Sequence, residues 1–177
     1  TSPLKDEIKM INRRKLVVVG DYSGKTTTVK TFTRDEVPKT YIGTVDLEIT
    51  DIEVNGQIIE VQIWDTCSRT RFESPRKSIF RGADAILLFF TIYSRTSFEN
   101  VKEIYLPEIL QSERKNAPLL LVGTRCNEPI RKREPAVGVE EAQRLVEEIN
   151  AIGYIECSAV CKLNVEEVFA RAVAATM

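Results

Sequence analysis

The sequence contains no histidine, no disulfide-type pattern of cysteines and no apolar run long enough to span a membrane. Without histidine the chain cannot form a Ser-His-Asp triad or a His-ligated metal site, and it lacks the most common general base. The four cysteines are dispersed and form no Cys-x-x-Cys pair, which favours a reduced cytosolic protein over a disulfide scaffold. The most apolar run, 85–93, is typical of a buried strand.

Neither sign of charge dominates, because 25 basic and 26 acidic residues give a net charge of -1. This balance gives no electrostatic reason to expect nucleic acid or an anionic membrane as a partner. No signal peptide opens the chain and no lipidation motif closes it, so we expect a cytoplasmic protein. Membrane association is expected only if a lipidated tail has been removed.

Apolar strand-like runs alternate with amphipathic helix-like runs along a chain whose length fits one domain. This order predicts an α/β fold, a six-stranded mixed sheet flanked by helices, with Asn55-Gly56 turning an antiparallel pair. Thr96 and Glu99 have capping-box spacing, and Pro107 is expected to kink the helix that follows. The expected strands are 15–19, 46–54, 58–65, 85–93, 117–124 and 153–159, and the main expected helices are 25–34, 139–149 and 164–174.

The stretch from Lys15 to Phe32 has the layout of a phosphate-binding loop. An apolar strand leads to Gly20, and Gly24, Lys25 and Thr26 open a helix. Backbone N–H groups, a helix N-terminus and a lysine are the groups that bind phosphates. The usual motif has four residues between its glycines, whereas this chain has only three, so the loop is one residue short.

Three oxygen-bearing residues are candidate Mg²⁺ ligands, because Mg²⁺ prefers hard oxygen ligands and retains waters. Thr26 follows the phosphate loop, Thr44 lies in a predicted loop before the second strand, and Asp65 ends the third. Thr44 or Asp65 alone would more often be a turn residue, but their combination and order favour a metal site.

These segments resemble a Ras-superfamily small GTPase domain, nearest to the Rho/Rac branch. The resemblance covers 15–177, leaving 1–14 as an N-terminal extension, and implies a P-loop G domain that binds GTP/GDP and Mg²⁺. It is carried by GKT (24–26), YIGTV (41–45), IWDT (63–66), TSFENV (96–101), LLLVGTRCN (119–127) and ECSA (156–159). The nucleotide-contacting positions that it implies are Gly20, Tyr22, Ser23, Gly24, Lys25, Thr26, Thr27, Val37, Thr124, Arg125, Asn127, Ser158, Ala159 and Val160.

The catalytic positions depart from the family pattern. Ser68 stands where the family has a glycine that senses the γ-phosphate, and Arg69 stands where it has the glutamine that orients water. Arginine has no acceptor atom, so Arg69 cannot orient water as an amide carbonyl does. Tyr22 adds bulk to the phosphate loop, which in the family blocks stimulated turnover. We therefore identify no confident catalytic residue and expect impaired hydrolysis.

The base-recognition positions depart as well. Asn127 replaces an aspartate that accepts two hydrogen bonds from guanine, and a mispaired polar group costs about 1–3 kcal/mol. Xanthine would match the amide better, unless Glu128 substitutes for the missing carboxylate. Val37 removes an aromatic contact with the purine, whereas Arg125 keeps the charge of the usual lysine. Ala159 is expected to offer its N–H to the base.

Two functions remain open at this stage. The first is a Rho/Rac-like nucleotide-dependent switch with impaired hydrolysis, read by effector proteins. The second is a pseudoGTPase, a G domain retained as a protein-interaction module, and a small-molecule P-loop kinase is a distant third. Regulators and effectors are expected at Thr44, Trp64, Arg69 and Phe72, although Trp64 is equally explained as a half-buried aromatic at a strand end.

Overall fold

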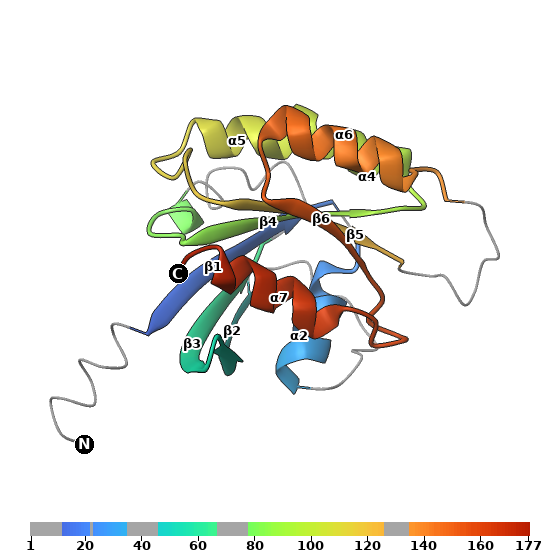
Figure 1. Ribbon diagram of the computed structural model, residues 1–177. Helices are drawn as coiled ribbons and strands as arrows, with labels where there is room; N and C mark the ends of the chain where they lie inside the picture. Colours follow the sequence, from blue (N-terminus) through green and yellow to red (C-terminus); the bar gives the residue numbers. More distant parts are fainter. Residues whose placement is uncertain (1–11, 22, 35–45, 67–77, 126–134) are drawn as a thin grey trace, which may run out of the picture.

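In the computed structural model, residues 12–21, 23–34, 46–66, 78–125 and 135–177 are described. They form a six-stranded sheet between two layers of helices (Figure 1). The strand order is β2-β3-β1-β4-β5-β6, and only β2 runs antiparallel to its neighbour. The predicted α/β fold with a mixed sheet is confirmed. The strands are β1 (Arg13–Gly20), β2 (Asp46–Val54), β3 (Gln57–Asp65), β4 (Ala85–Thr91), β5 (Leu119–Thr124) and β6 (Gly153–Cys157).

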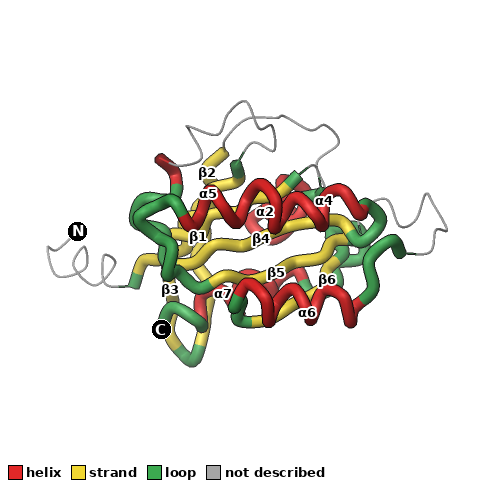
Figure 2. The backbone as a smooth tube through the Cα atoms, turned by 90° about the horizontal axis from the view of Figure 1, so that it is seen from above, coloured by secondary structure: helices red, strands yellow, loops and turns green. Residues whose placement is uncertain are grey.

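Helices cover both faces of the sheet. On one face lie α2 (Lys25–Arg34) and α7 (Val165–Ala174). On the other lie α4 (Arg95–Asn100), the π-helical turn η2 (Val101–Tyr105), α5 (Leu106–Leu110) and α6 (Val139–Ile149). Seen from above, α5 and α4 follow one another in one row and α6 forms a second row, with β4 and β5 visible between the two rows (Figure 2). This is the layered arrangement that buries parallel strands on both sides.

The sheet separates two apolar cores, because successive side chains of a strand point to opposite faces. In β1, Leu16 and Val18 pack with α2 and α7, whereas Val17 and Val19 pack with the helices of the opposite layer. Every residue of β4 and β5 is buried. The continuous apolar runs in the sequence therefore correspond to strands covered on both faces, as predicted.

The predicted hairpin is also present. Asn55 and Gly56 have φ values of 53° and 78°, and two consecutive positive φ values are the mark of a type I′ turn. The turn pairs β2 with β3 along their full length, from Asp46 opposite Asp65 to Val54 opposite Gln57. The metal-ligand candidate Asp65 is therefore fixed at the end of the pair farthest from the turn.

The helix after β4 differs from the sequence-based prediction in its cap and its regularity. Ser94, not Thr96, is the N-cap, and its hydroxyl accepts a 3.2 Å hydrogen bond from the backbone N–H of Ser97. Ser97 also donates to the carbonyl of Thr91, which fixes it in the first turn. The capping box predicted at Thr96 was wrong because this hydroxyl network starts the helix earlier. Instead of a simple kink at Pro107, the helix contains η2 just before that proline.

Other bounds differ from the predictions by up to two residues, as is usual where helices and strands fray. For example, β4 and β6 each end two residues earlier than predicted. Among the described residues, no helix combines the length and the apolar character that crossing a membrane would need.

Candidate nucleotide-binding site

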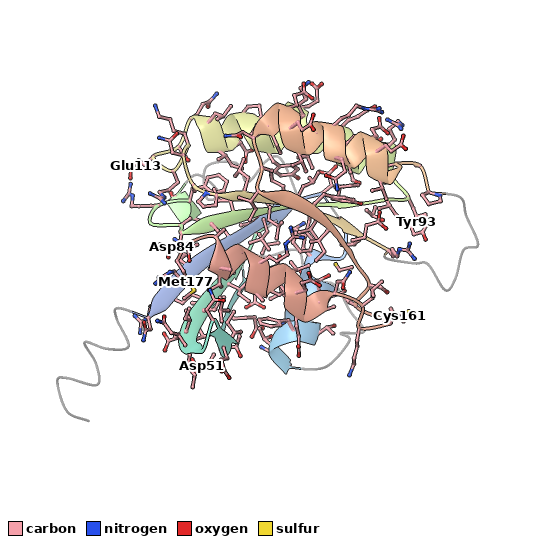
Figure 3. The ribbon with its side chains drawn as sticks, viewed as in Figure 1. Asp51, Asp84, Tyr93, Glu113, Cys161 and Met177 are labelled. Atoms are coloured by element: carbon pink, nitrogen blue, oxygen red, sulfur yellow. The ribbon has the colours of Figure 1, made fainter. Side chains whose placement is uncertain are left out.

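The predicted site residues lie where the parallel strands end. Gly20 ends β1, Asp65 ends β3, Thr124 ends β5, and Ser158 follows β6. In Figure 3 the residues Tyr93, after β4, and Cys161, after β6, lie at the same end of the molecule, whereas Asp84 precedes β4 at the other end. Ligands of open α/β sheets bind outside the carboxyl ends of the strands. The fold thus brings together segments that are far apart in sequence.

The phosphate loop begins at a glycine that no other residue can replace without strain. Gly20 has φ +142°, and a Cβ built on it would lie 2.1 Å from the carbonyl oxygen of Phe89 in the neighbouring strand β4. Gly24, with φ 78°, ends the loop, and α2 begins at the next residue. The backbone conformation at both positions of the predicted motif therefore favours glycine. The helix N-terminus lies where the motif requires it.

Lys25 is buried at this helix N-terminus, with 2% of its surface exposed. Its ammonium group donates to the carbonyl oxygens of Gly20, at 2.6 Å, and Asp21, at 2.9 Å. The first turn of α2 contains no acidic residue that would compete with an anion. A buried cation and a helix N-terminus next to the same short loop suit phosphate groups.

Two further contacts fix the loop from outside. The carboxylate of Asp21 accepts hydrogen bonds from the amide of Asn100, at 2.6 Å, and from the hydroxyl of Tyr105, at 2.7 Å. The hydroxyl of Thr124 donates to the carbonyl oxygen of Ser23 at 2.5 Å. Asp21 was missing from our predicted site residues, and no sequence signal links it to partners 79 and 84 residues away.

The two described metal-ligand candidates are in direct contact. The hydroxyl of Thr26 donates to Oδ2 of Asp65 at 2.5 Å. Burial raises the pKa of Asp65 to about 6, against the opposing effects of the Thr26 hydrogen bond and the Lys25 charge. Oδ1 of Asp65 is buried, and none of the described residues hydrogen bonds to it.

These donors fit Mg²⁺. A hydroxyl and a carboxylate with one unused buried oxygen are hard ligands beside the phosphate loop. Among the described residues, no group of three or more His, Cys, Asp or Glu side chains could hold a metal. A site with few protein ligands agrees with the preference of Mg²⁺ for waters and substrate phosphates.

The predicted base-recognition segments also meet. The backbone N–H of Arg125 donates to the carbonyl of Cys157 at 2.9 Å, joining the ends of β5 and β6. The Arg125 guanidinium bonds to Glu156 at 3.3 Å, and the Tyr154 hydroxyl donates to the other carboxylate oxygen at 2.9 Å. Burial, followed by the charge of Glu156, raises the pKa of Tyr154 above its usual range. Glu156, which we did not predict as a site residue, thus orients Arg125.

The remaining predicted contacts divide into those that the structure places and those that it does not. Ser158 is buried and exchanges backbone hydrogen bonds with Leu163, which closes the loop that carries Ala159 and the exposed Val160. Thr27 is half-buried on α2. The predictions for Tyr22, Val37, Thr44, Ser68, Arg69, Phe72 and Asn127 lie outside the described residues.

Trp64 is half-buried on β3, beside the metal candidate Asp65. Its ring packs at the edge of the apolar core that contains Val17, and the ammonium group of Lys15 lies 5.0 Å from the ring centroid. A partly exposed aromatic ring with a cation over its face fits two roles equally well. It can close the edge of an apolar core, or it can contact a partner protein. Both interpretations of Trp64 from the sequence remain open.

Comparisons with known proteins agree with this geometry. A sequence model described as the Ras family matches residues 15–177. The Rho-related protein racI of Dictyostelium discoideum is 35% identical over 174 residues, which cover 90% of this chain and 84% of that protein. Small GTPases of this kind bind guanine nucleotides with Mg²⁺ and act through effectors and regulators. The chain therefore belongs to the Ras superfamily of small GTPases and is Rho-like.

Proposed function

We propose that the protein is a Rho/Rac-like guanine-nucleotide-binding switch with impaired GTP hydrolysis, which acts by binding effector proteins. The observation that carries the proposal is the grouping of Lys25, Thr26 and Asp65 at the ends of β1 and β3. Asp65 keeps one buried oxygen without a hydrogen bond from the described residues and has a raised pKa, and groups perturbed in this way gather at functional sites.

Each of these groups has a definite task toward a nucleotide. Lys25 would neutralise phosphate charge, and the backbone N–H groups at the start of α2 would donate to phosphate oxygens. Thr26 and Asp65, together with Thr44, would hold Mg²⁺. The bound ion would neutralise negative charge on the phosphates. Arg125, oriented by Glu156, would stack on the base, because a guanidinium is planar and packs well on aromatic rings.

The impairment of hydrolysis follows from two residues of the sequence. Ser68 replaces the flexible glycine, and Arg69 replaces the glutamine that orients water in the family. Arg69 has only donors, so it can neutralise phosphate charge but cannot accept a hydrogen bond from the attacking water. We expect GTP to be bound for long periods, and effectors to recognise the bound form.

Effectors and regulators would bind through Thr44, Trp64, Arg69 and Phe72. Trp64 supports this part because its ring is only half-buried and the ammonium group of Lys15 lies over it, so part of an aromatic surface is available to a partner. The near-zero net charge and the dispersed cysteines support a cytoplasmic location, with membrane attachment if the full-length protein carries a lipidated tail.

One observation favours the alternative of a pseudoGTPase that binds partners without nucleotide. Several polar groups of the site already satisfy one another, since Lys25 bonds to two carbonyls of its own loop and Thr26 bonds to Oδ2 of Asp65. Such a site can remain folded without a ligand. The shortened loop and the exchanged Asn127 point in the same direction.

Nucleotide content distinguishes the two functions. The purified protein is denatured, any released nucleotide is identified by chromatography, and GTP, GDP and XTP are then titrated calorimetrically with Mg²⁺. We expect Mg²⁺-dependent binding that is abolished in Lys25→Ala and unchanged in Lys115→Ala, an exposed lysine in the loop before β5. If no nucleotide is released and no heat of binding appears at millimolar concentrations, the switch is refuted and the pseudoGTPase stands.

A further inference from the structure

Asp21 places a carboxylate inside the loop that would bind phosphate. Its negative charge does not favour a phosphate, because like charges repel over a few ångströms. Its two oxygens are instead each bonded to a neighbouring element, Oδ2 to the Asn100 amide at 2.6 Å and Oδ1 to the Tyr105 hydroxyl at 2.7 Å. The carboxylate therefore serves as an attachment point of the loop.

The two partners are brought to the same side of their helix by η2. Asn100 ends α4 and Tyr105 ends the π turn, five residues later. Residues five apart do not face the same way on an α-helix of 3.6 residues per turn. In η2 the N–H of Leu106 bonds to the carbonyl of Val101, an i→i+5 bond that widens the turn. The irregular turn thus presents two donors to one carboxylate.

The Tyr105 side of this contact is rigid. Tyr105 is fully buried and packs in the apolar core with Val17 and Val19 of β1, the strand that leads into the loop. Its hydroxyl is therefore held in place by the same core that fixes the start of the loop. The loop is attached at Asp21 to η2, at Ser23 to Thr124 of β5, and by Lys25 to its own carbonyls.

We propose that Asn100 and Tyr105 are positioning residues, which hold the shortened phosphate loop in its nucleotide-binding conformation through the carboxylate of Asp21. This inference rests on the proposed nucleotide-binding function. The loop is one residue shorter than the usual motif, and the two bonds to Asp21 attach it to a neighbouring helical segment. Nucleotide release is then controlled in part from the α4–η2 segment, which lies outside the predicted nucleotide-contacting positions.

The test exchanges donor and acceptor with little change of shape, and the double variant also keeps the total charge of the pair. Asn100→Asp sets two carboxylate oxygens against each other and breaks the contact. Adding Asp21→Asn reverses the donor and the acceptor. The amide introduced at position 21 donates to the carboxylate introduced at position 100, and its oxygen still accepts from Tyr105. Tyr105→Phe removes one hydrogen bond and keeps the buried ring. The control is Lys102→Ala, which removes an exposed ion pair with Glu148 from the same turn.

Two readouts are measured. The first is the dissociation rate of fluorescent methylanthraniloyl-GDP with Mg²⁺, and the second is amide hydrogen exchange of Asp21, Ser23 and Gly24 in nucleotide-free protein. Loss of a hydrogen bond to a charged group predicts roughly tenfold faster release and exchange in Asn100→Asp and Tyr105→Phe. We expect the double exchange to restore both rates and Lys102→Ala to change neither.

The possible results separate the two claims. If the parent protein binds no GDP, the proposed function fails, and the exchange rates of the nucleotide-free protein still decide whether Asp21 is anchored. If Asn100→Asp changes neither rate, or if Asp21→Asn fails to restore the rates in the double variant, the positioning role is refuted. Unchanged rates in Tyr105→Phe would show that Tyr105 has no part in the positioning role.

Discussion

Replacing Gly20 by alanine tests the close approach between the phosphate loop and β4. The new Cβ would lie 2.1 Å from the carbonyl oxygen and 3.0 Å from the carbonyl carbon of Phe89. Both are backbone atoms of a fully buried strand, so they cannot move aside as a flexible side chain would. Relieving such an overlap in a packed core costs about 1–3 kcal/mol, and the positive φ adds about 1–3 kcal/mol of strain.

The assay is urea denaturation followed by the fluorescence of Trp64, the single tryptophan. We expect Gly20→Ala to lower the free energy of unfolding by roughly 2–6 kcal/mol, out of the 5–15 kcal/mol typical of a domain. Gly56→Ala and Gly82→Ala are matched controls, because both glycines have positive φ and no atom within 4 Å of an added Cβ. They should show only the strain from φ. A loss in Gly20→Ala no larger than in these controls would refute the argument from close approach.

Three other substitutions test separate parts of the site and fold. Ser68→Gly combined with Arg69→Gln should raise single-turnover GTP hydrolysis at least tenfold, because an amide can orient water; equal rates would show that these residues are not the cause of slow hydrolysis. Asn127→Asp should improve the binding of GTP relative to XTP by about 10–100-fold, measured by calorimetry, because one mispaired hydrogen bond is corrected. An unchanged ratio of the two affinities would exclude the expected base contact. Glu48→Gln removes ion pairs with Lys30 and Arg34, and it should cost about 1–3 kcal/mol in urea denaturation because Glu48 is 7% exposed. A neutral result would mean that these pairs contribute no net stability.

The fold could be predicted from the sequence because its signals are local. Apolar runs such as 85–93 are long enough to indicate strands buried on both faces, and Asn55-Gly56 identifies the hairpin turn. The contact between Thr26 and Asp65 was also within reach, because the carboxyl ends of parallel strands meet at one edge of a sheet. The order of apolar and polar residues, together with the geometry of a parallel sheet, is enough to predict these features.

The contacts that escaped prediction are the ones between side chains distant in sequence. Asp21 meets Asn100 and Tyr105 only because η2 widens one turn of a helix, and no residue pattern distinguishes such a turn from an ordinary α-helix. The cap at Ser94 was missed for a related reason. A hydroxyl two residues later had the right spacing, and only the network around Ser97 decides between them.

The 2.5 Å hydrogen bond from Thr124 to the carbonyl oxygen of Ser23 joins the base-recognition strand to the phosphate loop. We therefore expect the two halves of the predicted site to be coupled, so that a change at one half alters the effect of a change at the other. Substitutions at Thr124 and Lys25 will not have additive effects on nucleotide affinity, and a double-mutant cycle will give a coupling energy between them. With such coupling, the contributions of the base and of the phosphates to binding would not be assignable to separate residues.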